Sequence, residues 1–365
     1  MSSDHRDRPQ PDDDWHPRIR WTPGELAETR PEGIAAVPGG EPTDPLGGEG
    51  HAMSMRESLR QGPVVPPPPA DDEEPPVRFE PFEQPPSYHR PHPKGGLPRG
   101  LPRSATAVPD MVFDGADYDG LTVRAASLRG DDHRYYGEPR QDAVALWPVS
   151  LAGTDAVAVC VADGVGSQPL AHEGAALACR LFRDEVERVA ASWAWDAFDE
   201  LAAGITAGVA DGMARYAAEA RADLKTLSTT LVAAVVDAGP GDEPRRAVML
   251  SVGDSAAYWL HAGKLAELMR DETAPGGGIV DPRTAALPGD PAAVRTVSGW
   301  LNREDVLVLC TDGLSNPMHG DEVRDRLVAS WSGPEVPGII EFGWQLAFRA
   351  KSYGDDRSAV CVWGR

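Results

Sequence analysis

The sequence predicts an α+β layered fold, and the order of its apolar segments is the reason. Short runs rich in Val and Ala, bounded by Gly, Asp or Pro, predict about nine strands. Longer amphipathic stretches predict four helices, gathered in two pairs. Strands in sets with helix pairs between them differ from the strict β-α-β alternation of a doubly wound sheet, so they indicate an α+β arrangement.

The predicted strands and helices occupy the following residue ranges. The predicted strands are 121–127, 142–149, 155–163, 228–237, 247–261, 263–268, 294–301, 305–313 and 358–364. The predicted helices are 170–190, 196–224, 320–331 and 334–352. Two prolines precede the last helix, so its regular part is expected to begin near Gly338.

The first part of the chain has a different composition from the rest. Of the 35 prolines in the 365 residues, 23 precede residue 111. This part also contains the run Pro66–Pro69 and the acidic run Asp71–Glu74. Such a segment buries too little apolar surface to offset its chain entropy. We therefore predict a disordered, Pro-rich, acidic N-terminal region over 1–112 and a folded domain over 113–365.

Charge and composition exclude several classes of protein. A formal net charge of −22 argues against nonspecific binding to nucleic acid or to an anionic membrane surface. The four cysteines form no CxxC pair and three of them lie in apolar runs, which predicts buried free thiols and a reducing compartment. Neither a secretory signal nor an 18-residue apolar stretch is visible, so we expect a cytoplasmic protein.

Aspartates stand at or beside the ends of four predicted strands: Asp142, Asp163, Asp312 and Asp355. A single such residue is usually a turn residue or a helix N-cap. Four that gathered in space would repel one another, and divalent cations would offset that repulsion. Oxygen ligands without Cys or His favour Mg²⁺ or Mn²⁺, and a pair of such ions suits hydrolysis of a phosphate ester.

Six motifs, in order over residues 121–365, resemble the metal-dependent type 2C Ser/Thr protein phosphatase family. SLRGDDHRYYGEPRQDAV is similar to the family's first acidic motif, and VCVADGVGS to its Asp-Gly-x-Gly motif. LSTTLVAAVV resembles the Thr-rich strand, and MLSVGDSAAYWLHAGKLAEL the Gly-Asp-Ser hairpin. LVLCTDGLSNPM and GDDRSAVCV resemble the last two acidic motifs, the second of which is usually Asp-Asn.

The resemblance implies that 113–365 is a type 2C phosphatase-like catalytic domain. Its expected fold is a four-layer α-β-β-α sandwich of two antiparallel sheets flanked by helix pairs. The resemblance also implies two Mn²⁺ or Mg²⁺ ions at one end of that sandwich. By resemblance, Asp163 would bridge the ions and the Gly164 carbonyl would bind one of them. Asp312 and Asp355 would hold the other ion, and Asp142 would act directly or through water. A hydroxide bridging the two metals would attack phosphorus in line. Asp254 matches a position that helps to bind a weak third ion.

Departures from the family pattern concern phosphate binding and the third ion. Gly137 stands where the phosphate-binding Arg is common, so Arg134 with His133 beside it, or Arg140, is expected to take that part. A surface salt bridge is an equally ordinary use for each arginine. Asn316 replaces a carboxylate of the third metal site, and Asp356 replaces the usual Asn.

The leading functional hypothesis is a cytoplasmic Ser/Thr phosphoprotein phosphatase that acts on phosphorylated proteins and opposes a Ser/Thr protein kinase of the same pathway. The alternative is a catalytically weak pseudophosphatase that serves as a metal-binding interaction or adaptor protein. Asn316 and the displaced arginine motivate the alternative, whereas the retained aspartates oppose it. A phosphatase of small phosphoesters is a third hypothesis.

Overall fold

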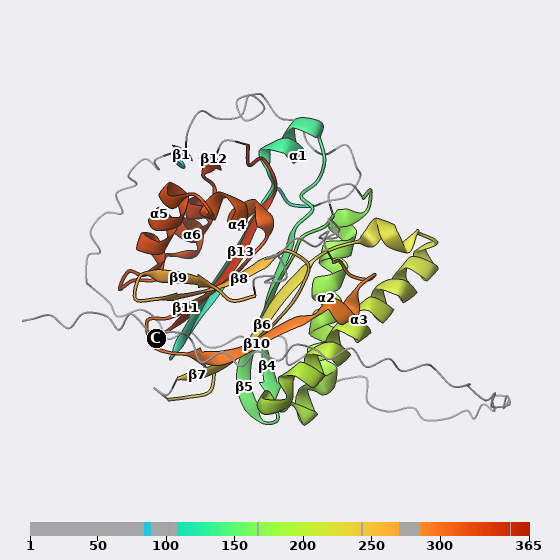
Figure 1. Ribbon diagram of the computed structural model, residues 1–365, viewed down its shortest axis with the longest axis horizontal. Coiled ribbons are helices and arrows are strands. Elements are labelled where there is room, and N and C mark those ends of the chain that lie inside the picture. The colour runs from blue at the N-terminus through green and yellow to red at the C-terminus, as the bar shows by residue number, and fades with distance from the viewer. Residues whose placement is uncertain are drawn as a thin grey trace, which may run out of the picture. The chain divides into compact units, whose positions relative to one another are not determined.

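The structure is a computed structural model that describes residues 84–88, 102, 108–165, 168–241, 244–269, 285–350 and 352–365. Two antiparallel sheets lie face to face, with helices on both outer sides (Figure 1). The five-stranded sheet has the order β10 (Arg295–Leu301), β7 (Arg245–Val252), β6 (Leu231–Asp237), β5 (Thr154–Ala162) and β4 (Ala143–Leu151). The six-stranded sheet has the order β2 (Met111–Tyr118), β3 (Leu121–Leu128), β13 (Arg357–Gly364), β11 (Val306–Cys310), β8 (Ala256–His261) and β9 (Lys264–Glu267).

Helices complete the outer layers. The five-stranded sheet packs on α2 (Ala171–Val189) and α3 (Phe198–Ala220). The six-stranded sheet packs on α4 (Asp312–Met318), α5 (Asp321–Trp331) and α6 (Ile339–Leu346). The short helix α1 (Asp131–Tyr136) follows β3. Short 3₁₀ turns occupy Ala190–Ser192, Trp195–Ala197, Leu224–Leu227 and Pro291–Ala293. The predicted α-β-β-α sandwich is confirmed.

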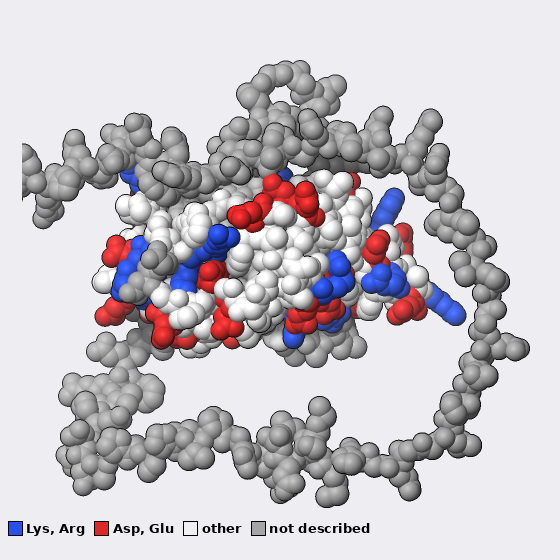
Figure 2. Space-filling view, turned by 90° about the horizontal axis from the view of Figure 1, so that it is seen from below, with Lys and Arg blue, Asp and Glu red and all other residues white. Residues whose placement is uncertain are grey.

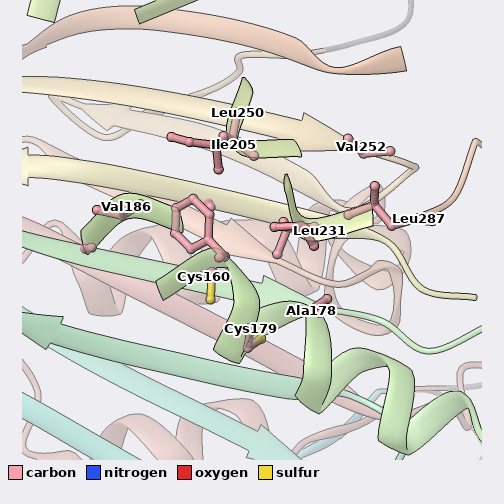
Figure 3. Packing of buried hydrophobic residues seen from close by; sticks show 14 of the residues in the cluster. Cys160, Ala178, Cys179, Val186, Ile205, Leu231, Leu250, Val252 and Leu287 are labelled. Atoms are coloured by element: carbon pink, nitrogen blue, oxygen red, sulfur yellow. The ribbon is translucent and has the colours of Figure 1, made fainter. Parts of the chain in front are cut away.

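Alternation along β5 shows how the sequence builds these layers. Ala156, Ala158, Cys160 and Ala162 belong to the cluster between this sheet and helices α2 and α3 (Figure 3). The valines between them, over 157–161, belong to the cluster between the two sheets. Small residues on the outer side allow the helices to pack closely, and β-branched residues fill the space between the sheets. All four cysteines are buried and free.

The structure differs from the sequence prediction in a few elements. The single strand predicted over 247–261 is broken at Gly253, whose φ of +104° lets the chain turn from the five-stranded into the six-stranded sheet. Strand β2 was not predicted because Asp114, Gly115 and Asp117 interrupt its apolar pattern at the edge of a sheet. Helices α1 and α4 were not predicted, because they are too short to show a helical repeat of apolar residues in the sequence.

A few residues of the predicted N-terminal region are described. Strand β1 (Ser87–Tyr88) pairs in parallel with β12 (Arg349–Ala350), and the Tyr88 ring meets the Phe348 ring edge to face with centroids 5.5 Å apart. Strand β2 begins at Met111. The rest of the region predicted to be disordered lies outside the described residues, so that assignment stays a prediction there.

The Tyr88 contact predicts a measurable loss of stability. Tyr88→Ala removes a half-buried ring and its edge-to-face partner, so unfolding should become easier by about 1–2 kcal/mol. Thermal unfolding of the full chain measures this change. Tyr353→Ala is the matched control, because Tyr353 is exposed and its replacement should cost less than about 0.5 kcal/mol. Equal melting temperatures for the two variants would contradict a stabilising contribution from the Tyr88 ring.

The face of the molecule in Figure 2 carries both signs of charge. On the face in Figure 2, Lys and Arg side chains lie beside Asp and Glu side chains. None of the helices in the described part of the chain combines the length and the apolar character that a membrane crossing requires.

Candidate active site

Strand pairing brings the predicted aspartates to one end of the sandwich. Ala143 at the start of β4 pairs with Ala162 at the end of β5, so Asp142 and Asp163 flank the same end of that pair. In the other sheet, Cys310 at the end of β11 pairs with Ala359 near the start of β13. Asp312 and Asp355 therefore also leave their strands at a shared end. Antiparallel register thus brings Asp142 to the same strand ends as Asp163, and Asp312 to the same strand ends as Asp355.

The electrostatics of Asp163 show that the two sheets present their acids to one another. Burial and then the charges of four carboxylates raise the pKa of Asp163 well above its ordinary value. Those four carboxylates are Asp142, Asp312, Asp355 and Asp254, the other acids that the sequence assigned to metal binding. The five predicted acidic side chains therefore lie within electrostatic reach at one site.

Asp312 and Asp142 also resist ionisation. Burial, followed by the charges of Asp355 and Asp254, raises the pKa of Asp312 to about 6, even though a hydrogen bond with Asp163 favours its charged form. Burial, followed by the charges of Asp356 and Asp355, raises the pKa of Asp142. The Thr311 hydroxyl donates a 2.9 Å hydrogen bond to Asp142 Oδ2, which links the start of β4 to the end of β11.

Close packing fixes the backbone around Asp163. Its carbonyl oxygen accepts 2.8 Å hydrogen bonds from the Thr230 amide and from the Thr229 hydroxyl. The next residue is Gly164, where an added Cβ would lie 2.5 Å from the Ala171 carbonyl oxygen at the start of α2. Only glycine fits that approach, so the predicted carbonyl ligand Gly164 is held by backbone contacts. Asp254 is exposed in the turn after Gly253.

The donor set fits hard divalent cations. The acids around Asp163 offer carboxylate oxygens, and their mutual charge is the main electrostatic cause that raises its pKa after burial. A divalent ion among such groups offsets their repulsion and stabilises their charged forms. Ions of the Mg²⁺ and Mn²⁺ type prefer oxygen ligands. The residues present therefore suit the predicted metal centre.

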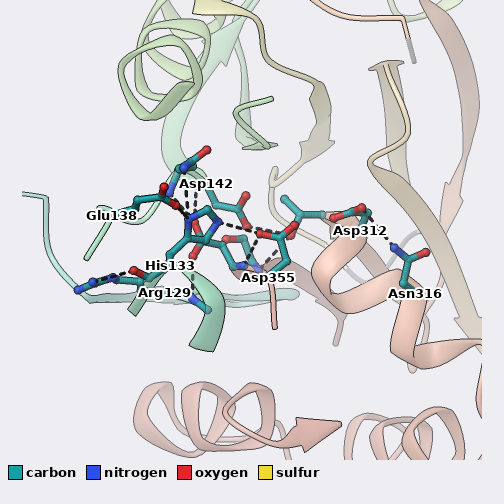
Figure 4. A network of polar contacts seen from close by, with 12 residues as sticks. Arg129, His133, Glu138, Asp142, Asp312, Asn316 and Asp355 are labelled. Atoms are coloured by element: carbon teal, nitrogen blue, oxygen red, sulfur yellow. Dashed lines mark hydrogen bonds and ion pairs between the residues drawn. The ribbon is translucent and has the colours of Figure 1, made fainter. Parts of the chain in front are cut away.

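His133 lies between two carboxylates at the edge of the acidic cluster (Figure 4). Its Nε2 is 3.0 Å from Asp355 Oδ1, and its Nδ1 is 3.0 Å from Glu138 Oε2. Burial favours the neutral ring, but the hydrogen bonds to both carboxylates and the charge of Asp356 outweigh it and raise the pKa of His133 to about 9. Partial desolvation by the surrounding protein favours neutral Asp355, but the hydrogen bond from His133 outweighs it and lowers the pKa of Asp355.

One group of three side chains, His133, Asp355 and Asp356, has potential ligand atoms that all lie within 4.8 Å of one another in the described part of the chain. Sequence reasoning had associated His133 with phosphate rather than with Asp355. Residues 133 and 355 lie in different motifs, and local pattern carries no signal for their contact.

The candidate arginines have carboxylate or carbonyl partners. Arg134 donates from Nη2 to Asp110 Oδ2 at 2.7 Å, and its Nη1 is 3.5 Å from Asp131 Oδ1. Arg140 is buried, and its Nη1 donates to the Ser127 hydroxyl and to the Asp142 carbonyl oxygen. Arg140 therefore supports the backbone beside Asp142. Arg134 lies at the surface of α1, with a side chain that is 18% exposed.

Asp356 contributes in a way that sequence reasoning did not anticipate. Its carboxylate is buried and accepts hydrogen bonds from the backbone N–H groups of Gly130, Gln141 and Asp142. An Asn at this position has a single acceptor oxygen, whereas Asp356 uses both of its oxygens. The two acceptor oxygens of Asp356 thus tie together the segments that carry α1 and Asp142. The other altered residue, Asn316, donates from Nδ2 to Asp312 Oδ2 at 3.2 Å.

Several solved structures are similar to this chain. PppA of Pseudomonas aeruginosa, a key regulatory component of T6SS, is 20% identical and the alignment covers 69% of this chain and all of PppA, with a TM-score of 0.42. The Mycobacterium tuberculosis Ser/Thr phosphatase PstP is 19% identical, with coverage of 67% and 99% and a TM-score of 0.43. RsbX in complex with magnesium is 15% identical, with coverage of 70% and 100% and a TM-score of 0.40.

A curated relative by sequence matches only part of this chain. The α-keto-acid decarboxylase of Mycobacterium tuberculosis is 34% identical over 90 residues. The match covers 22% of this chain, and the chain spans only 16% of the length of that enzyme.

The family comparison covers more than half of the chain. Residues 129–338 match the family described as Protein phosphatase 2C. This span includes Asp142, Asp163, Asp254 and Asp312, and Asp355 follows it. The order of the motifs, the two facing sheets and the acids gathered at one end agree with that match. The chain belongs to the protein phosphatase 2C family.

Proposed function

We propose that this protein is a metal-dependent Ser/Thr phosphoprotein phosphatase that hydrolyses phosphomonoesters. The observation that carries the proposal is the electrostatic environment of Asp163, which has four further carboxylates around it at one end of the sandwich. Such a concentration of charge destabilises a metal-free site and favours divalent ions. The family assignment supplies the reaction class.

The proposed ligands come from the ends of strands in both sheets. Asp163 and the Gly164 carbonyl lie at the end of β5, Asp142 precedes β4, and Asp312 and Asp355 lie beside β11 and β13. Asp254, in the turn between the sheets, is the proposed contributor to a weaker third site. Two Mn²⁺ or Mg²⁺ ions held there would lower the pKa of a water molecule and polarise the phosphoryl oxygens.

Around these ligands, the protein holds its own groups in place for the reaction. Thr311 donates to Asp142, and the Thr230 backbone N–H and the Thr229 hydroxyl both donate to the carbonyl of Asp163 and fix it. Arg134 is the proposed phosphate ligand, because guanidinium offers two parallel donors to phosphate. Its present partner is Asp110, so binding through Arg134 requires the phosphate to replace that carboxylate.

Phosphorylated proteins are the proposed substrates, and a Ser/Thr kinase is the proposed opposing enzyme. PstP, which shares the fold at 19% identity, is described as a Ser/Thr phosphatase, and its catalytic domain is described in complex with two manganese ions. We extend both properties to this chain as part of the proposal, together with a cytoplasmic location.

A second candidate function is a pseudophosphatase that binds metal and acts as an interaction protein. The observation that favours it is the engagement of Arg134 by Asp110 and Asp131, which leaves its guanidinium paired with carboxylates. Weak phosphate binding with intact metal binding would be the expected behaviour of such a protein.

Hydrolysis of p-nitrophenyl phosphate by the full chain, with and without Mn²⁺, tests the proposal. We expect turnover that requires Mn²⁺, and faster hydrolysis of phosphothreonine peptides than of sugar phosphates. Mn²⁺ binding without turnover would support the pseudophosphatase. Preference for sugar phosphates would contradict a protein substrate, and failure to bind Mn²⁺ would exclude both candidates.

A further inference from the structure

The chain Glu138–His133–Asp355 joins the edge of the site to a proposed metal ligand. We propose that His133, held by Glu138, is a positioning residue that fixes the Asp355 carboxylate for metal binding. This inference rests on the proposed function, and it assigns to His133 a part different from phosphate binding.

Two hydrogen bonds to Asp355 both end on the same carboxylate oxygen, Oδ1. Oδ1 lies 3.0 Å from His133 Nε2 and also accepts the Asp356 backbone N–H at 2.8 Å. Two donors on one oxygen set the torsion of the carboxylate. Oδ2 takes no part in either bond, so the arrangement presents a single oxygen as a ligand.

Asp355 depends on this support because its own surroundings restrain it little. Its side chain is 56% exposed, whereas the side chain of His133 is 10% exposed. An exposed aspartate samples several rotamers, and binding an ion would then cost conformational entropy. The hydrogen bond from the buried His133 ring holds the Asp355 carboxylate in one rotamer before the ion binds, so binding costs less conformational entropy. In other metal sites, residues that hydrogen-bond a metal ligand change the metal affinity by about 10–100-fold.

His133 can act in this way because its helix is fastened to the loop that carries Asp355. The Asp132 backbone N–H donates to the Gly354 carbonyl at 2.8 Å, and the Gly130 N–H donates to Asp356 Oδ1 at 2.7 Å. On the far side of the ring, Glu138 Oε2 accepts from Nδ1. The ring is therefore oriented from both sides, and α1 and the 354–356 segment form one unit.

Mn²⁺ titration by calorimetry tests the inference on the full chain, with affinity and the number of bound ions as readouts. His133→Ala should weaken Mn²⁺ binding by about 10–100-fold without changing the number of ions. Saturating Mn²⁺ should then restore most of the turnover. His133→Gln, which keeps an N–H donor, should recover part of the affinity. Glu138→Gln should weaken binding less, because an amide oxygen still accepts from Nδ1.

A second histidine–carboxylate pair provides the matched control. His261 Nδ1 lies 2.5 Å from Asp305 Oδ1. His261 ends β8, whereas Asp254 precedes β8, so this pair lies at the other end of the strand. His261→Ala removes the same kind of pair and should leave Mn²⁺ affinity unchanged.

The outcomes separate this inference from the proposed function. Wild-type affinity in both His133→Ala and His133→Gln would overturn the positioning role and leave the phosphatase proposal intact. Loss of one bound ion in His133→Ala would also overturn it, because His133 would then be a ligand of the group with Asp355 and Asp356. Failure of the unmodified protein to bind Mn²⁺ would overturn the proposed function and, with it, this inference. If His133→Ala does not fold, His133→Gln and Glu138→Gln decide.

Discussion

Asp163→Asn is expected to abolish Mn²⁺-dependent hydrolysis while making the metal-free protein more resistant to heat. The proposed bridging carboxylate disappears in this variant, so turnover should fall by at least about a thousandfold, equivalent to about 4 kcal/mol of transition-state stabilisation. An amide of the same shape carries no charge. Asp163→Asn therefore removes the repulsion between position 163 and the four carboxylates around it.

The gain in stability follows from the sign of the pKa shift. A carboxyl whose pKa is raised by folding destabilises the folded state at neutral pH, because folding requires either its ionisation against repulsion or its uptake of a proton. Removing the group removes that penalty. For a domain of this size, each kcal/mol corresponds to about 2–4 °C in melting temperature. Thermal unfolding in the presence of a chelator measures the rise.

Asp237→Asn provides the comparison for Asp163→Asn. Asp237 pairs with Ala156 near the start of β5, at the end of the sheet opposite Asp163, and its carboxylate accepts the Gly239 N–H. We expect its turnover to stay within about twofold of wild type, since surface changes away from a site have small effects. Comparable turnover in Asp163→Asn and wild type would refute the enzymatic proposal.

Local pattern determined most of the layers. In β5, small residues alternate with valine, so both the strand and its two buried faces follow from residues 155–163. The same reasoning failed for β2, where Asp114 and Asp117 are tolerated because the strand lies at a sheet edge. It also merged β7 with β8, because Gly253 looks like an ordinary strand residue until its backbone angle is known.

The candidate site was predictable in its residue types and less so in its contacts. Asp142, Asp163 and Asp312 were identified because each follows or precedes an apolar strand. The register of the antiparallel strands then places the neighbouring strand ends together at one end of each sheet. The contact between His133 and Asp355 spans 222 positions, and it depends on how α1 sits against the loop before β13. Nothing in either local segment encodes that geometry.

Acidification is expected to release metal from the site and to reduce the stabilisation that metal gives. Metal binding requires ionised carboxylates, and the pKa of Asp312 is raised to about 6. At pH 5 about nine-tenths of this group would carry a proton, so the apparent Mn²⁺ affinity should be about tenfold weaker than at pH 7.5 from Asp312 alone. Burial and like charge raise the pKa of Asp163 and of Asp142 as well, which steepens the fall.

The metal-free protein should respond to pH in the opposite direction. A raised folded-state pKa means that Asp312 binds more protons in the folded state than in the unfolded state between about pH 4 and 6. Its contribution therefore lowers stability as pH rises through that window, and the full penalty applies above it. Mn²⁺ relieves the penalty, so it should raise the melting temperature more at pH 7.5 than at pH 5. Thermal scans with Mn²⁺ or with chelator at the two pH values measure this difference. An equal Mn²⁺ effect at both would mean that these carboxylates do not hold the ion.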